Sequence, residues 1–98
     1  MLAGIEAAIS DDEIIDKNIQ KRIKLYPNPN PGTFQLEANF PLSDITHFKV
    51  TNLLGIPVYE TQQITSNTIQ LQNPAVGTHF VVIILKDGSV LTQKMMVQ

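Results

Sequence analysis

Prolines and a two-residue alternation of apolar and polar side chains constrain this chain more than any other feature. Six prolines lie between residues 27 and 74, and each one removes a backbone donor and interrupts helices. Apolar side chains recur at every second position in Phe34, Leu36, Ala38 and Phe40. This spacing is typical of a strand with one buried and one solvated face. The pattern therefore predicts short β-strands and argues against a helical fold.

The same alternation predicts an all-β domain of seven strands from residue 21 onward. The strands are expected near residues 22–25, 34–40, 48–50, 56–60, 68–71, 79–85 and 90–97. Gly55 and the Asp87-Gly88 pair predict tight turns, with a positive φ at Gly55. Pro57 confines its strand to a sheet edge or a bulge. Residues 79–85 are nearly all apolar, which predicts a strand that is covered on both faces or lies in mid-sheet. Such a set of strands indicates a β-sandwich or a small barrel.

Residues 1–20 differ in composition from the rest of the chain. They carry five acids and one base, whereas residues 21–98 carry four acids and six bases. Ser10 and the acids after it are typical of a helix N-cap, so a short helix from Asp11 to Gln20 is one interpretation. A flexible acidic linker is the other, because so short a helix is marginal in isolation. We therefore expect a linker over residues 1–20 and one β-domain over residues 21–98.

The composition excludes several classes of protein. The chain has no cysteine, which excludes disulfides and thiolate chemistry. The surplus of two positive charges over residues 21–98 is too small for a nucleic-acid-binding surface. No apolar run reaches the roughly 18 residues of a membrane span. No signal peptide is recognisable at the N-terminus. If the domain is secreted, its export signal is therefore expected upstream on a longer chain.

Candidate catalytic or metal-binding residues are few. His47 and His79 lack a neighbouring carboxylate in the sequence that would orient them as ligands or general bases. The acids of the β-domain are scattered one to a segment, at Glu37, Asp44, Glu60 and Asp87. Tyr26 and Tyr59 are the only aromatics of the amphipathic kind that often lines sugar-binding faces, and packing is the simpler role for both. We expect no catalytic residue, no bound cofactor and no metal.

Several motifs occur in an order that is more specific than any one of them. They are residues 23–29 with Tyr26, Pro27, Asn28 and Pro29, residues 48–58 with Gly55, residues 69–71, residues 74–82 with Gly77, and residues 94–97. In this order the chain resembles the type A C-terminal sorting domain of the type IX secretion system (the Por secretion system C-terminal sorting domain) over residues 22–98. Three features depart from the family pattern: His79 replaces a tyrosine, residues 30–32 extend the opening turn, and Lys94 stands alone where a lysine pair is common.

The resemblance implies a seven-stranded antiparallel immunoglobulin-like β-sandwich that acts as a sorting signal and not as an enzyme. It implies an upstream cargo domain on the same polypeptide and recognition by the type IX translocon in the outer membrane of a Gram-negative bacterium. It also implies release by a sortase-like peptidase, with a cut in the acidic stretch before Ile23. The cargo is then expected at the cell surface or in the medium.

The last strand is the expected contact with the translocon, because a terminal strand can pair with a partner through its edge. The residues expected in this contact are Lys94, Met95, Met96, Val97 and Gln98. The isolated domain is expected to be a monomer, or a weak dimer formed through an exposed edge at residues 56–60.

Two other interpretations stay open. The first is a non-catalytic carbohydrate- or protein-binding module of fibronectin or immunoglobulin type in a secreted enzyme or adhesin. It predicts an exposed aromatic platform or a calcium site. The second is a structural spacer domain, which predicts no transport defect on deletion.

Overall fold

The computed structural model describes residues 20–98, which form seven β-strands. The strands are β1 (Ile23–Tyr26), β2 (Thr33–Ala38), β3 (Ile45–Asn52), β4 (Pro57–Thr61), β5 (Thr68–Gln70), β6 (Gly77–Leu85) and β7 (Val90–Val97). Within this range the only helical element is a single 3-10 turn, η1 (Leu42–Asp44). The linker expected over residues 1–20 lies outside the described residues, except for Gln20. No helix of the described part is long and apolar enough to cross a membrane.

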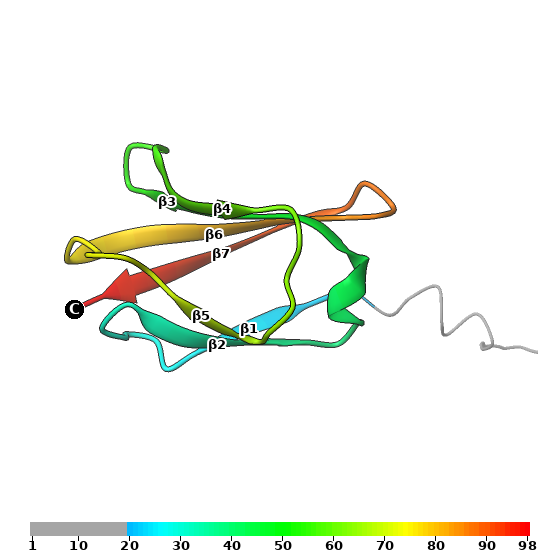
Figure 1. Cartoon of the computed structure of the whole chain (residues 1–98), viewed down its shortest axis with the longest axis horizontal. Coiled ribbons are helices and arrows are strands. Elements are labelled where there is room, and N and C mark those ends of the chain that lie inside the picture. Colours follow the sequence, from blue (N-terminus) through cyan, green and yellow to red (C-terminus); the bar gives the residue numbers. More distant parts are fainter. Residues whose placement is uncertain (1–19) are drawn as a thin grey trace, which may run out of the picture.

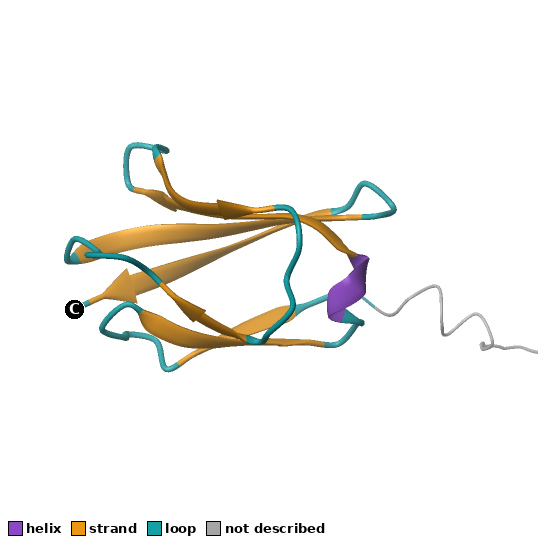
Figure 2. Ribbon diagram, in the orientation of Figure 1, coloured by secondary structure: helices purple, strands orange, loops and turns teal. Residues whose placement is uncertain are grey.

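The strands form two antiparallel sheets. One has three strands in the order β1-β2-β5, and the other has four in the order β4-β3-β6-β7. The sheets lie as two layers face to face (Figure 1), so the predicted sandwich is confirmed. The chain passes between the layers after β2, β4 and β5, and η1 lies in the first of these connections (Figure 2).

The sandwich has two ends with different loops. Residue 20, η1 and the β6–β7 turn lie at one end, on the right of Figure 1, which we call the proximal end. The β1–β2 connection, the β3–β4 hairpin, the β5–β6 connection and the last residues of β7 lie at the other, which we call the distal end. Whatever precedes residue 20 is therefore attached at the end opposite to the close of β7.

The core follows from the alternation read in the sequence. β2 buries Phe34 and Leu36 and turns Gln35 and Glu37 to solvent. The buried apolar residues of both layers are Leu25, Phe34, Leu36, Ile45, Phe48, Val50, Ile64, Ile69, Leu71, Val81, Ile83, Leu85, Met95 and Val97. The Tyr59 ring meets Phe48 edge-on, with ring centroids 5.9 Å apart. This geometry favours an aromatic pair, so Tyr59 has the packing role expected for it.

The position of β6 in the middle of its sheet explains why its sequence is apolar. It pairs with β3 on one side and β7 on the other, so the mid-sheet prediction is confirmed. Val81 and Ile83 are fully buried in the core, while Phe80, Val82 and Ile84 on the outer face are only half-buried. Coverage on both faces, the other prediction for this strand, is therefore not found within residues 20–98.

Proline and glycine act locally as expected. Pro57 begins the edge strand β4, where the pairing register with β3 shifts between Val50 and Thr51. Gly55 has φ +84°, a conformation that glycine adopts without steric cost. The strand expected over residues 34–40 ends earlier, at Ala38. The Asn39 side chain there accepts a hydrogen bond from Arg22 N (2.8 Å) and donates one to Gln20 O (2.9 Å).

Candidate recognition surface

Two segments singled out separately in the sequence meet at the distal end. The Asn28 side chain bridges two residues of β7: its Nδ2 donates to Lys94 O (3.2 Å), and its Oδ1 accepts from Met96 N (2.9 Å). The Tyr26–Pro29 motif and the last strand are 66 and 68 residues apart along the chain at these contacts. The two segments therefore form one surface.

Asn30 continues this contact with its backbone. Its N–H donates to Met96 O (3.0 Å), and its carbonyl accepts from Gln98 N (2.8 Å), which forms an isolated parallel bridge to Val97. The side chain is 1% exposed, and it accepts from Gly32 N (2.8 Å) and donates to Pro27 O (3.1 Å). Every polar group of this buried residue thus has a partner, as burial requires.

Residues 27–31, which we call the proline segment, therefore cover the outer edge of β7 from Lys94 to Gln98. Prolines were expected to keep these residues out of a sheet, and they do so except at Asn30, whose N–H lies between two prolines and remains free to donate. A partner strand that paired with β7 at Lys94–Gln98 would first have to displace this segment. The edge-pairing contact expected from the sequence is thus obstructed here.

The side chains of β7 alternate between the core and solvent. Met95 is 0% exposed and Val97 is 1% exposed, so both pack in the core. Lys94, Met96 and Gln98 are exposed. Lys94 lies opposite Phe80 and Met96 opposite Thr78 on β6. Of the five residues expected to contact a partner, only Lys94, Met96 and Gln98 can be reached in the folded domain.

Gly32, the last residue before β2, has no room for a side chain. Its φ is +117°, and an added Cβ would lie 2.5 Å from Cγ of Pro74. Gly32→Ala is expected to lower the free energy of unfolding by about 2–3 kcal/mol, because it combines backbone strain with a clash against a rigid ring. Gly55→Ala is the matched control, since its φ is also positive but no atom lies within 4 Å of the added Cβ. Gly55→Ala should lower the free energy of unfolding by only about 1 kcal/mol. Urea unfolding of both variants tests this, and equal losses would contradict it.

Apolar side chains that the sequence analysis did not single out gather at the distal end. Leu53, Leu54 and Ile56 in the β3–β4 hairpin are 68%, 83% and 55% exposed, and Val76 before β6 is 78% exposed. The sheet register places Asn52 opposite His79, so the hairpin and the start of β6 are neighbours. Two consecutive leucines at a turn were the signal that could have revealed this surface, because turn positions usually favour polar residues and glycine.

The hairpin tip is held by its own backbone and by one side chain. Asn52 Oδ1 accepts from Leu54 N (2.9 Å) and from Ile56 N (3.0 Å). In the backbone, Asn52 O accepts a hydrogen bond from Gly55 N (3.0 Å), and Asn52 N donates one to Ile56 O (2.9 Å). The exposed leucines therefore lie in an ordered turn. We call Leu53, Leu54, Ile56 and Val76 the distal apolar patch. Ordered apolar patches on a surface commonly mark interaction sites.

The proximal end is polar and charged. Lys21 Nζ lies 2.9 Å from Asp87, and Lys86 lies 3.8 Å from Asp44. Hydrogen bonds from Ser89 and Lys21 lower the pKa of the Asp87 carboxyl well below its ordinary value. Asp87 is thus an ionised turn residue, which agrees with its expected role in the turn.

The two histidines have different surroundings. His47 Nε2 lies 2.9 Å from Glu60 Oε2 across the β3–β4 pair on the outer face. No local pattern indicated this carboxylate, because the two residues are 13 positions apart in the sequence. His79 is 2% exposed, and its Nδ1 donates to Gly77 O (3.0 Å). Within residues 20–98 no group of three or more metal-ligating side chains is found.

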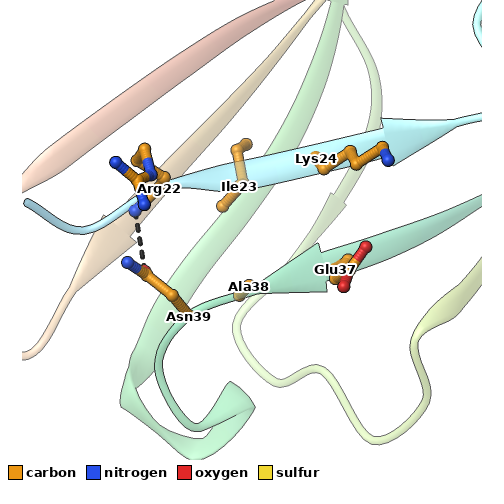
Figure 3. A pocket seen from close by; sticks show the side chains of 6 residues that line it. All are labelled: Arg22, Ile23, Lys24, Glu37, Ala38 and Asn39. Atoms are coloured by element: carbon orange, nitrogen blue, oxygen red, sulfur yellow. Dashed lines mark hydrogen bonds between the residues drawn. The ribbon is translucent and has the colours of Figure 1, made fainter.

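An open depression of about 430 Å³ lies over the start of β1 and the end of β2. Figure 3 shows the six residues that line it: Arg22, Ile23, Lys24, Glu37, Ala38 and Asn39. The dashed bond from Arg22 N to the Asn39 side chain lies at its rim (Figure 3). Tyr26 follows on the same face, 36% exposed, with Lys24 Nζ 5.7 Å from its ring centre. One exposed ring beside charged side chains does not amount to the aromatic platform that a sugar-binding module would need.

Comparison with known proteins gives a family match over most of the chain. The model of the family described as the secretion system C-terminal sorting domain matches residues 24–98. No curated protein matches the chain. The matched range includes all seven strands except the first residue of β1, and it includes both the proline segment and β7.

Proposed function

Because the chain belongs to the family of secretion system C-terminal sorting domains, we propose that residues 21–98 are the module by which the type IX translocon recognises an upstream cargo protein. Domains of this family are signals for type IX secretion, and proteins that carry them are exported to the cell surface or secreted by Gram-negative bacteria. The cargo lies upstream on the same polypeptide, and residues 1–20 are the linker to it.

The surface at the distal end is the observation that carries this proposal. Lys94, Met96 and Gln98 are exposed there, and the distal apolar patch lies at the same end. Protein interfaces commonly combine apolar side chains that become buried on association with a surrounding polar rim. The cargo is attached at the proximal end, so a translocon component can approach the distal end without meeting it.

The strand order supports an immunoglobulin-like form of the sandwich. β1, β2 and β5 correspond to strands A, B and E of that fold, and β4-β3-β6-β7 correspond to C′-C-F-G. In this assignment β7 is strand G, at the edge of the larger sheet. Pro57 on the opposite edge strand disfavours strand addition there, so we propose that the isolated domain is a monomer.

Removal of the domain by a sortase-like peptidase fits the anchoring of its first residues. Asn39 holds Gln20 O and Arg22 N, and Lys21 pairs with Asp87. A peptidase needs an extended backbone in its active site, so we propose that the cut lies within residues 1–20. The domain itself is proposed to be non-catalytic, in keeping with sorting signals in general.

An export assay tests the proposal. Residues 1–98 are placed behind a signal peptide and a fluorescent reporter, in a host with a type IX system and in a translocon-deficient strain. We expect reporter at the surface or in the medium of the first strain only. Reporter retained in the periplasm of both strains would contradict the sorting role, and a titration against polysaccharides would then test the binding-module interpretation.

The same assay tests the distal apolar patch. The double variant Leu53→Ser/Leu54→Ser is expected to lower export about tenfold, which corresponds to the loss of a modest apolar anchor. Its thermal stability should be unchanged, because both side chains are largely exposed. Val90→Ser is the matched control: Val90 is 59% exposed but lies at the proximal end. Equal export of the two variants would exclude the patch from the contact.

A further inference from the structure

We propose that Asn28 and Asn30 are positioning residues of the sorting signal. They take the place of a missing neighbouring strand and hold β7 so that Lys94 and Met96 are presented in one fixed arrangement. This inference rests on the proposed function, and it assigns to the opening motif a role in the recognition of a strand at the far end of the domain.

The outer edge of β7 needs a cover. β7 is the edge strand of its sheet, and it pairs with β6 without a register shift. In an antiparallel pair the N–H and C=O of alternate residues point away from the neighbouring strand. The contacts to the proline segment are made by Lys94, Met96 and Gln98, which identifies these as the outward residues. Without a cover the last residues of an edge strand would fray.

The proline segment is suited to cover this edge. Pro27, Pro29 and Pro31 have no N–H, so Asn28 and Asn30 contribute the only backbone donors within the segment. Asn30 pairs with β7 as a strand residue would, through N–H and C=O. Asn28 adds an acceptor and a donor from its side chain. Together they make four hydrogen bonds to the backbone of three alternate residues: Lys94 and Met96 in β7, and Gln98 directly after it.

The side chain of Asn28 holds β7 from outside the hydrophobic core. Asn28 is exposed, and both of its bonds to β7 come from the side chain. Its replacement therefore removes contacts to β7 without opening the core. Asn39 offers a matched comparison at the proximal end. Its side chain also donates to one backbone carbonyl, that of Gln20, and accepts from one backbone N–H, that of Arg22, two residues further along the chain. Asn28 holds β7, whereas Asn39 holds the residues that precede β1.

The experiment compares Asn28→Ala with Asn39→Ala in the 1–98 reporter fusion. Amide hydrogen exchange in the purified fusion and export in cells are both measured. We expect the Met96 amide to exchange about tenfold faster in Asn28→Ala, and export to fall by a similar factor, because a bond of about 1.4 kcal/mol corresponds to tenfold. Asn39→Ala should leave the exchange of the Met96 amide and the export unchanged. It should lower the thermal unfolding midpoint by about as much as Asn28→Ala does. Asn28→Asp keeps the acceptor for Met96 N and should be intermediate.

Three results would overturn the positioning role. They are unchanged exchange at Met96 in Asn28→Ala, normal export despite faster exchange, and equal loss of export in the two alanine variants. The last of these would indicate a general effect of stability. Export of the unmodified fusion in the translocon-deficient strain would instead refute the proposed function, whereas the exchange data would still decide whether Asn28 holds β7.

Discussion

Met95→Asp should unfold the domain, whereas Met96→Asp should leave it folded but impair export. Met95 is 0% exposed and belongs to the core, while its neighbour Met96 is 37% exposed on the outer face. A carboxylate buried without a partner costs more than about 4 kcal/mol, a large share of the 5–15 kcal/mol that stabilise a typical domain. Met96→Asp, on the exposed face, should lower the free energy of unfolding by only about 1 kcal/mol, because aspartate has a weak preference for strands.

Circular dichroism with urea unfolding and the export assay together measure these effects. We expect Met95→Asp to lack a cooperative transition and to be retained in the periplasm. Met96→Asp should unfold close to the unmodified chain, while its export falls about tenfold or more, because a charge replaces an apolar contact. Met95→Leu conserves volume and should cost less than about 1.5 kcal/mol. If Met96→Asp were exported normally, Met96 would not belong to the contact with the translocon.

Phe48→Ala is expected to destabilise the domain by about 3–5 kcal/mol, the range for truncation of a buried phenylalanine. Phe48 is fully buried in mid-sheet and forms the edge-on pair with Tyr59. So small a domain buries only about 60% of the surface of its unfolded chain and has little stability in reserve. Much of the population should then be unfolded at 37 °C, and export should fall because the recognition surface is lost.

Phe80→Ala is the matched control for this prediction. Phe80 lies one strand away on the outer face of the same sheet and is only half-buried. Its truncation should cost about 1–2 kcal/mol, in proportion to the smaller apolar area removed. Urea midpoints measured for both variants compare the two faces directly. A loss at Phe80 as large as that at Phe48 would mean that the outer face is covered as fully as the core.

Much of the architecture could be predicted because it is encoded locally. Alternation through Phe34 and Leu36 gave a strand and its buried face, Pro57 gave an edge with a bulge, and Gly55 gave a turn with positive φ. Each of these features depends on the backbone preferences of a few adjacent residues. The family could be recognised for a similar reason, since its motifs keep a fixed order along the chain.

The arrangement of the residues proposed for recognition could be predicted from the sequence only in part. Residues 94–98 contain two adjacent methionines, so alternation alone left open which of them faces the core. The leucines at the hairpin tip were assigned to a turn, and turn assignment says nothing of exposure. The carboxylate beside His47 comes from the neighbouring strand, a pairing that no local pattern indicates.

By itself the sequence determined the seven strands, most of the turns between them and the family to which the chain belongs, because periodicity and turn chemistry act over a few residues. Only the tertiary structure decided that Asn28 and Asn30 cover β7, that Met96 and not Met95 faces solvent, and that the distal apolar patch lies at the end of the sandwich opposite to η1. These facts depend on how two sheets pack and on contacts between residues up to 68 positions apart. Such contacts form only when the whole core closes, and for that reason no single segment encodes them.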